Sequence, residues 1–229
     1  TPPGPCAGSL PGRETLFSGE SGQIRARACA RAYDGVLPVR HDLRSACRLL
    51  ALATLCATAA LQAAPAARLS DLDGRAVDPF QASAGAKAIV FLFTGVECPI
   101  SNRYAPVAAA LHERFASKGV RFWLIYPSRF DEAAAIRTHL KAFSYPFGAL
   151  RDPDHVLARL TGASVTPEAA LFDSGGHQVY RGRIDDRYVG LSIERPAPTT
   201  RDLDEAISAV LAGKRVARAT TQAVGCFIE

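Results

Sequence analysis

Residues 88–101 read AIVFLFTGVECPIS, and this stretch decides how the chain is expected to fold. Its first six residues form a continuous apolar run, which is typical of a strand buried on both faces of a sheet covered by helices. A short turn follows, and Cys98 then stands directly before Pro99. Because proline is favoured at the first helical position, Cys98 is predicted at or beside the N-cap of a helix.

The position of Cys98 predicts a reactive thiol. Free backbone N–H groups and the positive end of the helix dipole stabilise a thiolate at a helix N-terminus. The thiolate is the attacking species in thiol–disulfide exchange. Glu97 acts in the opposite direction, because a neighbouring negative charge raises the pKa of a thiol. A buried cysteine that only packs is the alternative interpretation.

Downstream of Cys98, the apolar spacing predicts strands that alternate with helices. Strands are expected at 120–126, 147–150, 168–173 and 177–183, and helices at 104–115, 131–143, 152–160 and 201–211. Asp131 is expected to favour its helix as an acidic N-terminal residue, and His139 is expected at a helix surface or boundary. The alternation implies a three-layer α/β domain with a mostly parallel sheet and an antiparallel edge hairpin at 168–183.

The composition, with 48% hydrophobic and 21% charged residues, is that of a globular protein. It excludes a wholly disordered chain and a fibrous repeat. The formal net charge is +5, but residues 1–63 hold seven Lys and Arg against four Asp and Glu, so much of the excess lies there. A nucleic-acid-binding surface is therefore not predicted.

Residues 37–63 have the pattern of a secretory signal peptide. Arg40, Arg44 and Arg48 precede an apolar run of thirteen residues at 49–61, and Ala63 suits a cleavage site. The run is well short of the roughly 20 residues that span a bilayer, so no stable membrane anchor is predicted after cleavage. Residues 1–36 are expected to be disordered or an upstream extension. Residues 64–229 then form one domain in a periplasmic or secreted protein.

Cleavage at this site leaves two cysteines, Cys98 and Cys226. In an oxidising compartment two thiols pair, react or stay buried, and the sequence leaves a redox pair, a permanent disulfide and two unrelated cysteines all open. The Thr166–Pro167 bond is a candidate for the cis form. The histidines show no metal-ligand spacing with Cys98 or with each other, so neither a metal site nor a cofactor is predicted.

Several short motifs together resemble the redoxin and AhpC/TSA group of the thioredoxin superfamily, especially its peroxiredoxin-like bacterial members. The motifs are Gly95–Pro99, Asn102–Pro106, Arg151–Pro153, Thr166–Glu168, Tyr180–Asp186 and Val224–Cys226. The resemblance covers residues 68–228 and implies a thioredoxin-like three-layer sandwich. It places Cys98 at the first cysteine of the thioredoxin motif. It also places Pro167 at the cis-proline, whose loop, with Thr166, offers its backbone to an extended substrate.

Two features depart from the patterns of this superfamily. Ser101 stands where thioredoxin-like enzymes carry a second cysteine. Peroxiredoxins have a threonine three residues before their reactive cysteine and a proline before that threonine, whereas here Thr94 lies four residues before Cys98 and the proline is absent. Together with the expected signal peptide, the resemblance nevertheless predicts an exported thiol–disulfide oxidoreductase that acts on protein thiols or disulfides. Cys98 is its expected nucleophile, Cys226 or an external thiol resolves the intermediate, and Ser101, Thr166 and Pro167 border the substrate groove.

Two other functions stay open at this point. A non-catalytic module that binds an extended peptide or a partner protein is favoured by Ser101, because a lone cysteine cannot release itself through that position. An atypical thiol peroxidase, with Cys98 reacting with peroxide, is the weaker alternative.

Overall fold

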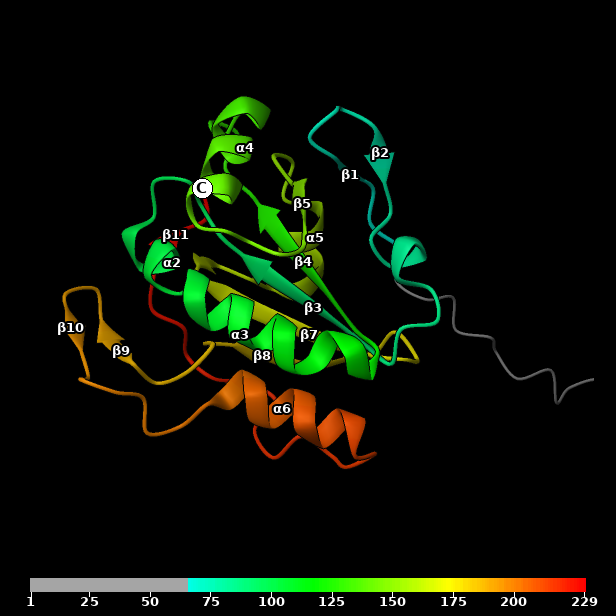
Figure 1. Cartoon of the computed structure of the whole chain (residues 1–229), viewed down its shortest axis with the longest axis vertical. Coiled ribbons are helices and arrows are strands. Elements are labelled where there is room, and N and C mark those ends of the chain that lie inside the picture. The colour runs from blue at the N-terminus through cyan, green and yellow to red at the C-terminus, as the bar shows by residue number, and fades with distance from the viewer. Residues whose placement is uncertain (1–65) are drawn as a thin grey trace, which may run out of the picture. The chain divides into compact units, whose positions relative to one another are not determined.

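The computed structural model of the chain describes residues 66–229 (Figure 1). The expected upstream extension at 1–36 and the expected signal peptide at 37–63 lie outside the described residues. Within residues 66–229, no helix has the length and apolar character needed to cross a membrane.

Three parallel strands form the middle of a seven-stranded sheet. Strand β3 (Ala88–Phe93) pairs in register with β4 (Val120–Tyr126), and β4 pairs with β5 (Gly148–Arg151). Antiparallel strands flank this centre, and the complete order is β2-β1-β5-β4-β3-β7-β8. The mixed α/β architecture with a parallel centre and an antiparallel edge hairpin is thus confirmed.

The edge strands come from two hairpins. Strand β7 (Glu168–Asp173) runs antiparallel to β3 and turns into β8 (Gln178–Gly182) at one edge. At the other edge, β1 (Leu69–Ser70) pairs with both β5 and β2 (Ala76–Val77). All six side chains of β3 are buried, as expected of a strand with helices on both faces.

Helices cover both faces of the sheet, as the alternation along β3 requires. Ala88, Val90 and Leu92 pack in one cluster with α3 (Ala105–Phe115) and α6 (Asp202–Leu211). The intervening side chains of β3 pack in a second cluster with α5 (Val156–Thr161) and with Phe80, which directly precedes a short 3₁₀ turn, η1 (Gln81–Ser83). Figure 1 shows α3 and α6 in front of the sheet and α5 behind it.

Two predicted helices begin later than expected. The helix expected from Asp152 begins at Val156, because the Asp152 carboxylate accepts hydrogen bonds from the backbone N–H groups of Val156, Leu157 and Ala158 at 2.7, 3.0 and 2.9 Å. Helix α4 (Ala133–Ala142) begins two residues after Asp131. Asp131 directly precedes the N-cap residue Glu132, lies outside the first turn and makes no capping bond to that helix.

The remaining elements are short. Helix α2 (Pro99–Arg103) precedes α3, and a 3₁₀ turn, η2 (Ala116–Lys118), follows it. Strands β9 (Tyr188–Gly190) and β10 (Ile193–Glu194) form a separate hairpin. Strand β6 (Val165–Thr166) pairs antiparallel with β11 (Cys226–Phe227) in a two-stranded sheet of their own.

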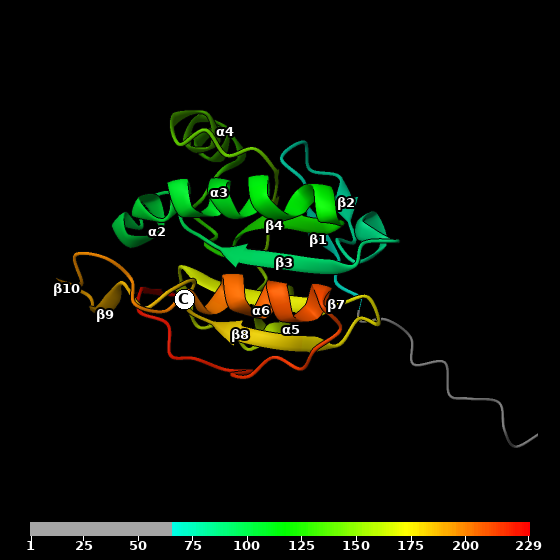
Figure 2. The same ribbon diagram turned by 60° about the horizontal axis from the view of Figure 1, so that its bottom comes forward.

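The segment after α6 returns along the edge of the main sheet. Arg181 of β8 donates its N–H to Ala219 at 2.9 Å and accepts a bond from Thr221 N–H at 3.0 Å. The chain then crosses to β6, where it forms β11 (Figure 2). We call residues 222–229 the C-terminal tail. The sequence predicted no strand there.

Candidate functional site

Cys98 is the N-cap residue of α2, with extended backbone angles and with Pro99 at the start of the helix. Its side chain is 5% exposed. Strand β3 ends at Phe93, and the loop between them turns back so that Cys98 N–H bonds to Gly95 O at 3.2 Å. The local prediction for this cysteine is therefore correct in position.

The C-terminal tail brings Cys226 to Cys98. The Sγ atoms lie 2.8 Å apart, with the Cys226 thiol as donor and Cys98 as acceptor. The Cys98 thiol in turn donates to the carbonyl oxygen of Thr166 at 3.0 Å. Both cysteines are free thiols in this structure. The structure thus joins three residues that the sequence analysis singled out separately.

The two thiols differ in acidity. Burial by itself raises the pKa of Cys98, but hydrogen bonds from Cys226, Ser101 and Thr166 outweigh burial and hold that pKa below its usual value. Burial and the neighbouring Cys98 raise the pKa of Cys226 to about 11. The exposed Glu97 is not among the groups that shift the pKa of Cys98. Cys98 therefore loses its proton first and Cys226 keeps its proton as a donor.

Ser101 lies one turn into α2 and is 2% exposed. Within residues 66–229 its hydroxyl has no hydrogen-bond partner of normal geometry, although it is one of the groups that lower the pKa of Cys98. A hydroxyl placed in this way can donate to a thiolate. Ser101 therefore contributes a donor where a dithiol enzyme has its second sulfur.

The Thr166–Pro167 peptide bond is cis, and both residues are buried. Thr166 accepts the Cys98 thiol at its carbonyl and pairs with Cys226 across the two short strands. The backbone that was expected to receive a substrate is thus occupied by the chain's own tail. Ser101, Thr166 and Pro167 all lie beside the cysteines.

A cavity of about 400 Å³ opens beside the two thiols. The loop before Cys98, the loop after β4 and the tail form its walls, with Thr166 between them. Phe130 and Phe227 line it and are 84% and 78% exposed, respectively. The cavity therefore combines a sulfur centre with exposed aromatic surface, which suits a ligand with apolar side chains.

Asp131 is part of the site, although the sequence does not reveal it. Its side chain is 7% exposed and lines the same cavity. It accepts a hydrogen bond from the backbone N–H of Val96 at 3.3 Å, and burial raises its pKa. No local signal in the sequence reveals this contact, because 35 positions separate the two residues.

His139 was expected at a helix surface or boundary, and that expectation is wrong. It is 4% exposed, with Nδ1 2.9 Å from the Tyr126 hydroxyl and Nε2 2.7 Å from Oδ1 of Asn102. The Asn102 amide donates onward to the carbonyl of Val96 at 3.1 Å. Burial lowers the pKa of His139. A buried polar chain therefore runs from β4 through α4 and α2 to the loop that carries Cys98.

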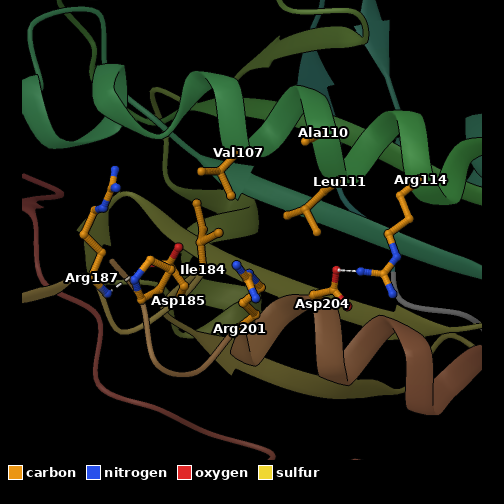
Figure 3. A pocket seen from close by; sticks show the side chains of 10 residues that line it. Val107, Ala110, Leu111, Arg114, Ile184, Asp185, Arg187, Arg201 and Asp204 are labelled. Carbon is orange, nitrogen blue, oxygen red and sulfur yellow. Dashed lines mark hydrogen bonds and ion pairs between the residues drawn. The ribbon is translucent and has the colours of Figure 1, made fainter. Parts of the chain in front are cut away.

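A second cavity of about 410 Å³ lies between α3 and α6 (Figure 3). Its floor is apolar, with Val107 and Leu111 of α3 facing Ile184. At its rim Arg114 pairs with Asp204 at 2.5 Å. None of its lining residues is a cysteine or a residue of the Cys98 cavity. It holds no nucleophile and carries no part of the site.

Metal-binding groups do not gather in the part of the chain that the structure describes. Among residues 66–229, no three His, Cys, Asp or Glu side chains lie close enough together to hold an ion.

Comparison with known proteins gives a family and a fold. The AhpC/TSA family model matches residues 60–181, more than half of the chain. The comparison with curated proteins found no match.

Two similar solved structures are an uncharacterized conserved protein from Geobacillus kaustophilus and a hypothetical protein from Sinorhizobium meliloti 1021. Each is 26% identical to this chain, and each alignment covers 72% of this chain. The alignments cover 89% of the Geobacillus protein and 91% of the Sinorhizobium protein, and the TM-scores are 0.64 and 0.61, respectively.

A third structure shares the fold. It is a putative thiol:disulfide interchange protein DsbE from Chlorobium tepidum, 19% identical, covering 65% of this chain and 94% of its own, with a TM-score of 0.51. The family match over more than half of the chain and the layered sheet with Cys98 at its first helix lead to one conclusion. The chain belongs to the AhpC/TSA family and has a thioredoxin-like fold.

Proposed function

We propose that the chain is an exported thiol–disulfide oxidoreductase that acts on protein thiols or disulfides. The observation that carries this proposal is the pair of free thiols 2.8 Å apart, with the pKa of Cys98 lowered and that of Cys226 raised. Such a difference separates an attacking thiolate from a thiol that reacts second.

The reaction has two exchange steps. The Cys98 thiolate attacks one sulfur of a substrate disulfide, a Cys98–substrate disulfide forms, and the other substrate sulfur leaves as a thiolate that takes up a proton. Cys226 then loses its proton and attacks Cys98 Sγ. This step forms a Cys98–Cys226 disulfide and releases the second substrate thiol. The substrate gains two electrons and the protein loses two, so an external dithiol must reduce the protein again.

Ser101 and Thr166 support the first step. The buried Ser101 hydroxyl is placed to donate to the Cys98 thiolate, and the Thr166 carbonyl accepts the Cys98 thiol while that thiol is protonated. Loss of the Cys98 proton leaves this carbonyl free for another donor, such as the backbone N–H of an extended peptide. Pro167 follows directly and has no N–H of its own.

Export is part of the proposal and rests on residues 37–63. A positively charged segment, an apolar run of thirteen residues and a small residue at 63 are the features of a cleavable signal peptide. Expression of the chain in a bacterial host, followed by intact mass of the periplasmic fraction, tests it. A product that begins at Ala64 is expected, and an uncut chain in the cytoplasm would contradict export.

The enzymatic proposal is tested by redox titration of residues 64–229, whose only cysteines are Cys98 and Cys226, read by alkylation and intact mass. A Cys98–Cys226 disulfide with a potential between about −120 and −270 mV is expected, because exchange catalysts lie in that range. A potential below about −300 mV would make the bond a permanent disulfide. Two thiols that never pair would leave a binding module as the function.

A second candidate is thiol peroxidase activity. The hydroxyls of Thr94 and Ser101 are buried and have no hydrogen-bond partner of normal geometry among residues 66–229, and Thr94 lines the Cys98 cavity, so its hydroxyl is a candidate donor to a small oxygen ligand. Attack of Cys98 on a peroxide gives a sulfenic acid and an alcohol or water. Cys226 then displaces water from that sulfenic acid to form the disulfide. Trapping of the sulfenic acid in Cys226→Ser after one equivalent of hydrogen peroxide tests this candidate.

A further inference from the structure

The edge of β6 beside Cys98 is already occupied by a strand of the chain itself. Cys226 pairs with Thr166 and Phe227 with Val165, and the N–H of Ile228 donates to Ser164 O at 3.0 Å. An extended peptide binds a protein by adding a strand to an open edge, and its main-chain hydrogen bonds supply affinity. The tail therefore lies as such a peptide would lie. β6 pairs with no other strand of the described residues.

The fit of the tail depends on a glycine directly before the cysteine. A Cβ at Gly225 would lie 2.5 Å from the Thr166 carbonyl carbon, closer still to its oxygen, and 3.0 Å from Pro167 N. These neighbours are backbone atoms, so they cannot move aside as a flexible side chain does. Any segment that crosses the loop in the same register needs a residue without a side chain at this point.

The tail can leave β6 without leaving the protein. Upstream of it, Thr221 is bonded to Arg181 through its backbone and to the Tyr180 hydroxyl at 2.7 Å through its side chain. β11 has two residues, and Phe227 is largely exposed. Detachment breaks this short pairing and lifts Val224, Cys226 and Ile228 from the core clusters they pack against, while the tether keeps Cys226 near the site.

We infer that the tail is a tethered competitor for the peptide-binding edge of β6, a conclusion that rests on the proposed exchange activity. A substrate segment displaces the tail to reach Cys98 and forms the mixed disulfide. The tail then returns to the same edge, and Cys226 attacks Cys98 Sγ as the substrate thiol leaves. Cleavage of the Cys98–substrate disulfide by Cys226 and departure of the substrate segment are therefore one event, because the edge of β6 cannot hold two strands at once.

The inference also names a substrate class. Segments that bind this edge in the register of the tail carry a glycine directly before the reacting cysteine. An apolar residue after the cysteine is favoured, because Phe227 holds that place beside the exposed Phe130 at the cavity.

The test uses the chain after removal of residues 1–63, which has no cysteine besides Cys98 and Cys226, with Cys226→Ser, so that the mixed disulfide is trapped while the tail keeps its backbone. The probe is the peptide AVGCFIE, the sequence of residues 223–229, as a mixed disulfide with thionitrobenzoate. Attack of Cys98 on the peptide sulfur releases thionitrobenzoate, which is followed by its absorbance, and adds the peptide to the chain, which is followed by mass.

Addition of Gly225→Ala is expected to accelerate this release by about tenfold or more, because a tethered strand competes at an effective concentration of about a millimolar. Gly190→Ala is the matched control, since a Cβ there meets only side-chain atoms at 3.6 Å or more, and it is expected to change nothing. Deletion of residues 223–229 is expected to accelerate release as Gly225→Ala does. This second variant removes the competitor without adding a side chain.

A peptide with alanine in place of its glycine is expected to react more slowly than the glycine peptide in the deleted chain. Equal release rates in all chains and with both peptides would overturn the inference that the tail competes for the edge of β6. Such a result would still be consistent with Cys98 as a nucleophile. The absence of release in every chain would overturn the proposed function as well.

Discussion

Cys226 Sγ lies 2.8 Å from Cys98 Sγ, although 128 positions separate the two residues in the chain. A strand pairing holds them together, because β11 runs antiparallel to β6 directly before Pro167. The resolving group of a thioredoxin-like site normally comes from the same helix turn, where this chain has Ser101. Here a segment from the end of the chain supplies the second sulfur.

Replacement of each cysteine is expected to have a different effect. Cys98→Ser abolishes exchange with a disulfide substrate, because the thiolate is lost. Cys226→Ser keeps the first attack but slows release of the product by about a hundredfold or more, because a tethered thiol has an advantage of that size over a free one. Intact mass during turnover measures both effects. Cys226→Ala serves as the control, and a Cys226→Ser chain that turns over at the normal rate would contradict the role of this residue.

Alkylation as a function of pH is expected to distinguish the two thiols. The thiolate fraction rises with pH and is half-complete at the pKa, so Cys98 reacts at a pH below the usual range for a thiol. Cys226, whose pKa is raised to about 11, reacts only in strong alkali. Iodoacetamide labelling with peptide mapping measures both profiles.

Ser101→Ala is expected to move the Cys98 profile to higher pH, because it removes one of the groups that lower the pKa of that thiol. Ser101→Thr keeps a hydroxyl and serves as the control that retains the profile. An unchanged profile in Ser101→Ala would show that the serine is a space-filling residue.

His139 is expected to make stability fall in mild acid. Burial lowers the pKa of His139, so the folded chain favours the neutral ring while the unfolded chain binds a proton at about pH 6.5. Stability from this residue is complete above that pH and decreases as the pH falls through the pKa of the folded state. Denaturant unfolding of the wild-type chain and His139→Gln between pH 4 and 8 measures the difference, since glutamine does not titrate.

The same comparison separates His139 from two buried carboxylates. Burial raises the pKa values of Asp131 and Asp152, so the folded chain takes up protons at these residues more readily than the unfolded chain. These two residues therefore make the fold more stable as the pH falls, which is opposite to the effect of His139. Both residues are present in wild type and in His139→Gln, so their effects cancel in the difference. A difference that does not change with pH would contradict the assignment.

Asp131→Ala is expected to destabilise the fold by about 1–3 kcal/mol, because it leaves the partly buried Val96 N–H without its acceptor. Asp131→Asn keeps an acceptor oxygen and is expected to lose much less. Urea unfolding at neutral pH, with the free energy of unfolding extrapolated to water, measures both variants. Equal losses in the two variants would show that the charge of Asp131, rather than its hydrogen bond, stabilises the loop.

The parts of the structure that the sequence predicts are those with local causes. The apolar run at 88–93 predicts β3 because a strand between two layers of helices must be apolar on both faces. Pro99 predicts the start of α2 and so the place of Cys98, because proline suits a first helical turn. The alternation of such elements predicts a three-layer α/β domain, and the resemblance of the short motifs implies that this domain is thioredoxin-like.

The parts that the sequence does not predict depend on distant residues. Asp131 reads as a helix-start residue, but its carboxylate bonds to Val96, and His139 reads as a boundary residue, but it is enclosed by β4 and α2. Propensity and spacing act over a few positions, whereas these contacts form when elements pack together. A short polar side chain has the same local pattern whether it faces water or a buried partner.

The sequence by itself therefore determined the central strands and the edge hairpin of the main sheet, the order of the helices that cover it, and a cysteine at the start of the first helix after β3. Tertiary structure alone decided that Cys226 reaches Cys98 and that the tail lies on the edge of β6. The reason is physical. Local backbone preferences set the elements, but the pairing of two short strands from distant parts of the chain depends on how the whole sheet places their edges.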